Sequence, residues 1–220
     1  MARKYPMKAE DVIAQLHQNP EWVRRREERE KQRTKNEEKL RKAQTILLLE
    51  LSSIGIKLSS IYDLVNSKQR YDAAIPILLT HLTANYPDRV REGIARSLGR
   101  PWARKVAWHP VLDAYRREPN KSRTASQGAV GAPSGPKDGL AAALSEMANP
   151  DDLSQIIDLI SDPSNGPSRM FFIRNLARSR SRRAFEALAK LSNDPDLKKE
   201  IEVCLRGKLK VAHRNSTSSS

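Results

Sequence analysis

Arginine residues recur at matching positions in two distant stretches of this sequence. Aligned at one constant offset, they pair as Arg91 with Arg169, Arg96 with Arg174, Arg100 with Arg178, and Arg104 with Arg182. A guanidinium group is a planar fork of N–H donors that can bind a carboxylate or phosphate through two hydrogen bonds. If the two stretches belong to stacked repeats, the matching arginines lie in rows on one surface, and the pattern predicts an anion-binding face.

Two interpretations of these arginines remain open. In the first, Arg91 and Arg169 are structural and pair with an acid in a turn, such as Asp88 or Asp162, while the other six form a solvated face. In the second, the row binds a partner. The candidate partner-binding residues are then Arg96, Arg100, Arg104, Arg174, Arg178, Arg182, Trp102 and Trp108, with Arg180 and Arg183 nearby.

Residues that could catalyse a reaction or hold a metal ion are scattered. The four histidines are His17, His81, His109 and His213, and they lack the spacing of metal ligands. No glycine-rich phosphate loop, nucleophile elbow or paired-carboxylate motif occurs. The single cysteine, Cys204, excludes an intramolecular disulfide, and we expect it to be an inert buried thiol. The sequence therefore predicts a protein that is not an enzyme and that uses no cofactor or metal.

The charge balance is strongly basic. The chain of 220 residues carries a formal net charge of +14, from 40 basic and 26 acidic side chains. Such an excess favours nucleic acid as a partner, but here it is spread along the chain, and evenly spread charge also serves solubility. Aromatic residues make up only 5%, few for a site that stacks bases. No apolar run has the length of a membrane span or the form of a signal peptide, so we expect a cytoplasmic protein.

The N-terminal part of the chain predicts helices of unusual composition. A short helix is expected over residues 7–17, and a second begins where Asn19 precedes Pro20, a capping residue before a proline at the first helical position. Residues 24–39 contain no apolar side chain, and the same helix then becomes apolar and ends at Gly55. This charged segment is expected to be a solvated arm, and the alternative is a basic helix lying on nucleic acid.

Apolar residues farther along the chain repeat in pairs of helices. In the second helix of each pair, two apolar residues stand four apart, as Ile94/Leu98, Leu140/Leu144, Phe172/Leu176 and Ile201/Leu205. The first helices share a four-residue pattern, seen in Ile75, Leu78, Leu79 and Leu82 and again in Leu153, Ile156, Ile157 and Ile160. A two-helix unit of roughly thirty residues is typical of an α-solenoid. A long Gly-, Pro- and Ser-rich loop is expected over 119–137, and helices over 139–148, 151–161, 168–179, 182–192 and 196–211.

The run from Val90 to Gly99, VREGIARSLG, resembles the second-helix signature of HEAT repeats. Residues 71–211 resemble bacterial HEAT-repeat proteins of the short, degenerate-repeat kind, and residues 58–82 resemble the opening segment of an intracellular bacterial group whose role is generally unassigned. The resemblance implies an all-α, right-handed solenoid that presents a concave face to a protein or nucleic acid. It transfers no catalytic residue. The expected organisation is a helical arm over 1–57, the solenoid over 58–211 and a Ser-rich disordered tail over 212–220.

Two functions follow from this reading. The first is a non-enzymatic scaffold or adaptor whose HEAT-like surface holds an acidic protein partner. The second is a nucleic-acid-binding protein that contacts the phosphate backbone through basic residues, in the manner of HEAT-repeat DNA glycosylases. Mixed charge and few aromatic residues favour the first, because a pocket that stacks or extrudes bases needs aromatic walls.

Overall fold

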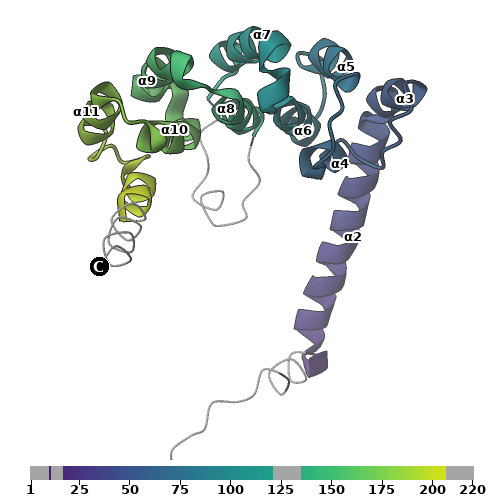
Figure 1. Ribbon diagram of the computed structural model, residues 1–220. Helices are drawn as coiled ribbons and strands as arrows, with labels where there is room; N and C mark the ends of the chain where they lie inside the picture. Colours follow the sequence, from purple (N-terminus) through teal and green to yellow (C-terminus); the bar gives the residue numbers. More distant parts are fainter. Residues whose placement is uncertain (1–9, 11–16, 121–134, 207–220) are drawn as a thin grey trace, which may run out of the picture. The chain divides into compact units, whose positions relative to one another are not determined.

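The computed structural model describes residue 10, residues 17–120 and residues 135–206 (Figure 1). Most of the predicted helix over 7–17, most of the predicted loop over 119–137 and the whole predicted tail over 212–220 lie outside the described residues. Every regular element within them is helical, as expected from the sequence. None of the described helices combines the length and apolarity that a bilayer crossing requires.

The helices follow one another with short connections. In chain order they are α2 (Pro20–Ala43), α3 (Thr45–Ser53), α4 (Tyr62–Asn66), α5 (Ala74–His81), α6 (Asp88–Leu98), η1 (Pro101–Ala103), α7 (Arg104–Arg117), α8 (Pro136–Met147), η3 (Pro150–Asp152), α9 (Leu153–Ser161), η4 (Pro163–Phe172), α10 (Ile173–Arg178), α11 (Arg182–Lys190) and a last helix that is described over 198–206. The elements labelled η are 3₁₀ helices.

The chain divides into two compact units, Met1–Ala43 and Gln44–Ser220. The sequence placed this division between residues 57 and 58 and expected one helix from Pro20 to residue 54. That helix is instead interrupted at Gln44, whose buried side chain accepts a hydrogen bond from the Ile61 N–H at 3.0 Å. The apolar half of the expected helix, α3, therefore belongs to the second unit.

Helix α2 is the described part of the first unit, and its charged sequence explains why it has no buried face. The side chain of Asn19 caps it by accepting the N–H groups of Glu21 and Trp22 at 3.0 and 3.2 Å, as the sequence predicted. Along the helix, exposed ion pairs such as Arg25–Glu21 and Lys42–Glu38 join residues four apart. Each such pair stabilises a solvated helix by only about 0.2–0.5 kcal/mol.

The helices of the second unit lie in two layers (Figure 1). Helices α3, α5, α7, α9 and α11 follow one another in the first layer, and α4, α6, α8 and α10 follow one another in the second. Contacts join neighbours within a layer, such as α6 with α8, and partners across layers, such as α5 with α6 and α7 with α8. Each helix therefore buries its apolar side against elements that are close to it along the chain.

The repeated apolar pairs form the core of the second layer. The buried pairs are Ile94/Leu98, Leu140/Leu144 and Phe172/Leu176. In the last pair Ile201 is buried, but Leu205 is 38% exposed, so the repeat pattern does not reach the core at that position. In the first layer Trp108, Val111, Leu112 and Tyr115 of α7 are buried.

The start of α8 differs from the prediction. The helix begins at Pro136, within the stretch expected to be a loop, because a proline suits the first helical position and the Asp138 carboxylate accepts the Gly135 N–H at 3.3 Å. The buried Lys137 side chain donates to the backbone carbonyl of Glu118 at 2.9 Å, and the Glu118 carboxylate binds the guanidinium of Arg91. These contacts join the end of α7 to the start of α8 and to α6.

Gly99 is required by the packing of α6 against α8. Its φ of −71° is one that any amino acid can adopt, so the backbone conformation alone does not demand glycine. A Cβ atom at this position would lie 2.7 Å from the Cα of Ala143 in α8. The glycine therefore permits the close approach of α6 and α8, and Gly139 does the same against the backbone of Glu92 at 2.9 Å.

Replacing Gly99 with alanine should lower the free energy of unfolding by about 1–3 kcal/mol, because backbone atoms must move to admit the methyl group. Gly135→Ala is the matched control, since, among the described residues beyond its chain neighbours, no atom lies within 4 Å of the position that its Cβ would occupy. We expect that control to change stability by less than about 0.5 kcal/mol. Urea denaturation followed by circular dichroism measures both, and equal stability of the two variants would contradict the close helix contact.

Candidate binding clefts

Two adjoining clefts open beside the second layer of helices. The central cleft, of about 530 Å³, lies among α4, α6, α8, α10 and the last helix, and Arg96, Arg100 and Arg174 line it. The distal cleft, of about 680 Å³, lies among α8, η3, α9 and α10, and Arg174, Arg178 and Arg180 line it. Arg174 belongs to both linings, so the two clefts meet at this side chain.

Arg96 and Arg100 also serve the fold. Arg96 Nε donates to Glu92 Oε1 at 2.8 Å, and this glutamate is only 1% exposed. Arg100 Nε donates to the Tyr71 hydroxyl at 2.7 Å, and its Nη2 lies 2.8–3.1 Å from three carbonyl oxygens at the end of α4. Carbonyl groups at a helix end lack the full set of partners found inside a helix, and of these three only Leu64 O accepts a backbone N–H, that of Ser67, among the described contacts. Arg100 therefore acts as a side-chain cap. Much of the donor capacity of both arginines is already used.

Arg174, Arg178 and Arg180 are different, because they are exposed and form no ion pair with a carboxylate of the described residues. Arg174 and Arg178 stand one turn apart on α10, and Arg180 lies in the short segment between α10 and α11. Arg174 shares a side-chain hydrogen bond with the Cys204 thiol, which does not neutralise its charge. The three positive charges are therefore available to an anionic ligand.

The remaining candidates lie outside the clefts. Arg104 forms a bidentate ion pair with the buried Asp152, at 2.7 and 3.0 Å, and Arg182 pairs with Glu186 of its own helix at 2.8 Å. Trp108 is buried and donates its indole N–H to Gln155 at 3.2 Å. Trp102 packs edge-on against Tyr71, with ring centroids 5.0 Å apart. The structure thus brings together Arg96, Arg100, Arg174 and Arg178 but not Arg104, Arg182, Trp102 or Trp108.

Arg91 and Arg169 form structural ion pairs, as one interpretation expected. Arg91 binds Glu118 and lies 3.9 Å from Asp88. Arg169 is 2% exposed and binds Asp194 at 2.8 Å and Asp196 at 3.3 Å rather than the predicted Asp162. The sequence could not identify Glu118 or Asp194 as the partners, because each lies in a different helix pair from its arginine.

Acidic and apolar residues give the two clefts different characters. Glu146 and Glu200 offset the arginines of the central cleft, whereas the distal cleft contains one acid, Glu146, against three arginines. The distal cleft also has an apolar floor that includes Leu153 and Ile156. Sequence reasoning placed both residues in the core pattern and did not recognise this second role, which no local signal indicates.

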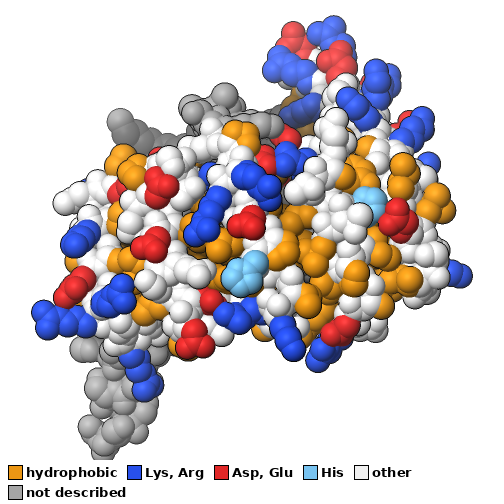
Figure 2. Space-filling model, turned by 90° about the horizontal axis from the view of Figure 1, so that it is seen from above, with side chains coloured by type: hydrophobic (Ala, Val, Ile, Leu, Met, Phe, Trp, Pro, Cys, Tyr) orange, Lys and Arg blue, Asp and Glu red, His pale blue; other side chains and the backbone are white. Residues whose placement is uncertain are grey.

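The outer face of the first layer does not gather positive charge as the distal cleft does. Figure 2 shows basic and acidic side chains interspersed among hydrophobic ones over this face. Large exposed hydrophobic residues in its helices include Ile46 and Leu49 of α3 and Val106 of α7. Of the two surfaces, the distal cleft is therefore the one where arginines outnumber nearby acids.

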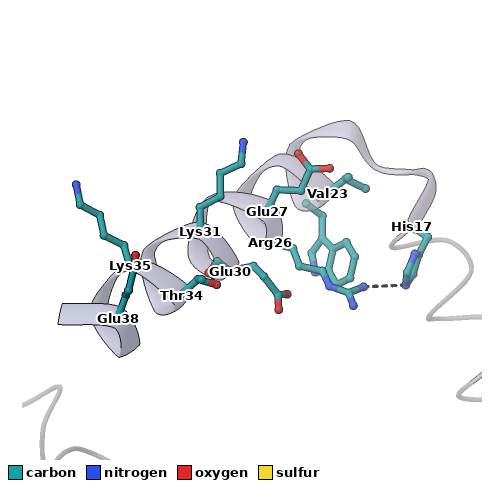
Figure 3. A pocket seen from close by; sticks show the side chains of 10 residues that line it. His17, Val23, Arg26, Glu27, Glu30, Lys31, Thr34, Lys35 and Glu38 are labelled. Atoms are coloured by element: carbon teal, nitrogen blue, oxygen red, sulfur yellow. Dashed lines mark hydrogen bonds between the residues drawn. The ribbon is translucent and has the colours of Figure 1, made fainter. Parts of the chain in front are cut away.

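A groove of about 600 Å³ runs along α2 in the first unit (Figure 3). At one end the rings of His17 and Trp22 are 5.2 Å apart, and Arg26 covers the indole and reaches His17 Nε2 at 3.3 Å. Farther along, Lys31 and Lys35 point away from the helix (Figure 3). Acidic residues alternate with these basic ones in the lining, so the groove has no clear charge preference.

The described histidines and the cysteine do not form a catalytic or metal-binding set. No group of three or more potential metal ligands occurs within the part of the chain that the structure describes. His81 is buried between the Tyr86 hydroxyl at 2.7 Å and the Glu50 carboxylate at 3.0 Å. Cys204 is half-buried instead of buried as expected. Burial, the largest effect, and the charge of Glu200 raise the pKa of this thiol, which keeps it protonated and weakly nucleophilic.

No protein-family model, curated protein or solved structure matches this chain. The resemblance to HEAT-repeat proteins therefore stays a prediction from the sequence.

Proposed function

We propose that this chain is a non-enzymatic scaffold or adaptor whose second unit is a right-handed solenoid of HEAT-like helix pairs. The layered packing of α4 to α11 and the burial of three repeated apolar pairs support the solenoid. In this proposal the two clefts form the binding face, and the partner is a protein with an acidic surface.

The observation that carries the proposal is the set of three guanidinium groups around the distal cleft that no carboxylate of the described residues neutralises. Arg174, Arg178 and Arg180 are exposed, and Glu146 is the one acid among the described residues that line the same cleft. Like charges gathered at one concave site attract an oppositely charged partner together and select against a partner of the same sign. An anionic partner can therefore bind these arginines without first breaking an ion pair inside the protein.

A protein partner suits the clefts better than nucleic acid. Apolar residues of α9 contribute to the distal cleft, and a phosphate backbone offers them no apolar surface to pack against. Phe171 is the single aromatic residue among those described in the two linings, and Arg96 covers its ring with 5.7 Å from the guanidinium to the centroid. Base stacking therefore has no open platform here. The net charge of +14 is what supports nucleic acid as the alternative partner.

Reversing the three charges should abolish binding of the acidic partner. The test variant combines Arg174→Glu, Arg178→Glu and Arg180→Glu. A matched control combines Lys105→Glu, Arg116→Glu and Arg117→Glu, which alters the net charge equally through exposed residues of α7. Each protein is used as affinity bait with and without nuclease, and captured proteins are quantified by mass spectrometry. We expect one partner whose capture is unaffected by nuclease to be captured at least about tenfold less by the test variant, and to be captured normally by the control.

Nucleic acid as the partner predicts a different pattern. Capture would then depend on nuclease treatment, and retention of mixed-sequence DNA or RNA would fall steeply as salt rises, because each neutralised phosphate releases counterions. If the test variant, shown by circular dichroism to be folded, keeps every partner that the control keeps, the clefts are solvated surface and the proposal is wrong.

A further inference from the structure

We infer that the distal cleft binds an extended acidic segment in which an aliphatic side chain lies between two carboxylates. This inference rests on the proposed function and specifies the partner chemistry at that site. It combines three features of the cleft: an apolar floor, walls that internal hydrogen bonds hold in place, and a rim of arginines that form no ion pair with the described carboxylates.

The apolar floor is contributed by η3 and α9. Pro150, Leu153 and Ile156 line it, and Ile156 is almost completely buried, so it forms the bottom of the cleft. The volume of about 680 Å³ lies within the range of about 300–1,000 Å³ typical of ligand pockets. A purely anionic ligand would leave this apolar surface in contact with water. An occupant with an aliphatic side chain covers it.

The wall made by α8 and α10 is held by two hydrogen bonds between Ser145 and Asn175. Asn175 Nδ2 donates to the Ser145 carbonyl oxygen at 2.9 Å, and Ser145 Oγ lies 2.7 Å from Asn175 Oδ1. Ser145 Oγ is also 2.9 Å from the carbonyl oxygen of Phe171. These contacts fix α10, and with it Arg174 and Arg178, relative to α8.

The floor is held in a similar way. Asn149 accepts the N–H groups of Asp151 and Asp152 at 2.9 and 3.3 Å, and the Asp152 carboxylate accepts the Asn149 N–H at 2.9 Å. Arg104, the first residue of α7, binds the same Asp152 carboxylate. Because both sides of the cleft are fixed before a ligand arrives, binding costs little conformational entropy of the protein. Arg104 thus acts on the cleft as a positioning residue.

The spacing of the arginines indicates the spacing of the acids. Arg174 and Arg178 are one helical turn apart, a rise of about 6 Å at 1.5 Å per residue. In an extended chain, alternate residues lie on one side and are about 6.6 Å apart. Two acids separated by one residue therefore match these two arginines, and Arg180 can bind a third acid. The residue between the acids supplies the aliphatic group.

The occupant is expected to be another protein and not a second copy of this chain. Two molecules that each carry a net charge of +14 repel one another. The described helix with the most charge, α2, has more basic than acidic residues, so it does not complement the arginines of the cleft.

The experiment is a selection of short random peptides displayed on phage against the full-length protein. The best binder is synthesised with a fluorescent label, and its affinity is measured by anisotropy. We expect selected peptides to share an acid–aliphatic–acid core. Replacing the aliphatic residue of the peptide by serine should weaken binding about tenfold, and replacing the acids by their amides should weaken it at least as much. Because these changes are in the peptide, they do not depend on the folding of a variant protein.

Variants of the protein separate the inference from the function on which it rests. Leu153→Gln should lower the affinity for the selected peptide about tenfold. Val106→Gln, at an exposed apolar position of α7, should leave that affinity unchanged. If peptides depend on the arginines but not on their aliphatic residue or on Leu153, the inference is wrong and the acidic-partner proposal stands. If no acidic peptide is enriched, or if the triple arginine variant binds equally, both are wrong. Displacement of the peptide by mixed-sequence RNA as effectively as by unlabelled peptide would assign the cleft to nucleic acid and overturn both.

Discussion

Replacing Arg169 with alanine is expected to lower the free energy of unfolding by about 3–5 kcal/mol, because it leaves Asp194 without its buried partner. Arg169 binds this carboxylate at 2.8 Å, donates Nε to the Gly166 carbonyl at 2.9 Å and lies 3.3 Å from the Asp196 carboxylate, so several acceptors lose their donor at once. Arg182→Ala is the control, since Arg182 is 90% exposed and its pair with Glu186 should contribute less than about 1 kcal/mol. Urea denaturation measures both, and equal effects would show that the buried pair contributes no more than a surface pair.

The same pair makes stability depend on pH in a defined direction. Burial, the largest effect, raises the pKa of Asp194, but hydrogen bonds from Arg169 and from backbone N–H groups together outweigh it and leave the pKa below its ordinary value. An acid with a lowered folded-state pKa stabilises the protein above its unfolded pKa of about 3.9, and this stability is lost as pH falls through the folded pKa. In Arg169→Ala the burial effect remains without the guanidinium, so the loss should begin at a higher pH than in the wild type. Denaturation curves measured from neutral to acidic pH test this shift.

Leu98→Ala should destabilise the second unit by about 2–5 kcal/mol, because it removes buried methyl groups and leaves a cavity between α6 and its neighbours. Leu205→Ala makes the same chemical change at the corresponding repeat position. Leu98 is fully buried, whereas Leu205 is 38% exposed, so the control should change stability by less than about 1 kcal/mol. Thermal and urea denaturation of the two variants give the comparison. A change below about 0.5 kcal/mol for Leu98→Ala would contradict its burial.

The helical architecture could be predicted from sequence because its signals are local and repeated. Apolar residues four apart identify the buried side of α6, α8 and α10, and Asn19 and Pro20 mark the start of α2 through local capping chemistry. Other features depend on contacts between distant residues. The interruption at Gln44 needs Ile61 as its partner, and Gly99 is needed because Ala143 lies against it. No window of sequence around Gln44 or Gly99 contains that information.

The candidate site could be predicted only in outline. Arg174 and Arg178 stand four apart on α10 and are both exposed, and helical periodicity is enough to predict that two such residues share a face. It does not reveal which acid comes close to each arginine. Arg104 is taken by Asp152, and Arg100 caps α4, although both occupy positions of the same row. Whether an arginine is available to a ligand depends on tertiary neighbours, which lie beyond the reach of periodicity.

The hydrogen bond between Lys137 and the Glu118 carbonyl marks a position where the protein should tolerate an insertion. Asn120 and Gly135 flank residues 121–134 in the chain and stand two residues from Glu118 and Lys137, which this bond joins, while the Glu118–Arg91 pair ties the same point to α6. For a loop with joined ends, doubling the length adds only about 0.6 kcal/mol of closure entropy. A reporter domain could therefore be fused between Asn120 and Gly135, or new chain termini opened there by circular permutation, while α7 and α8 keep their mutual anchor. Evolution could lengthen the chain at the same point for the same reason.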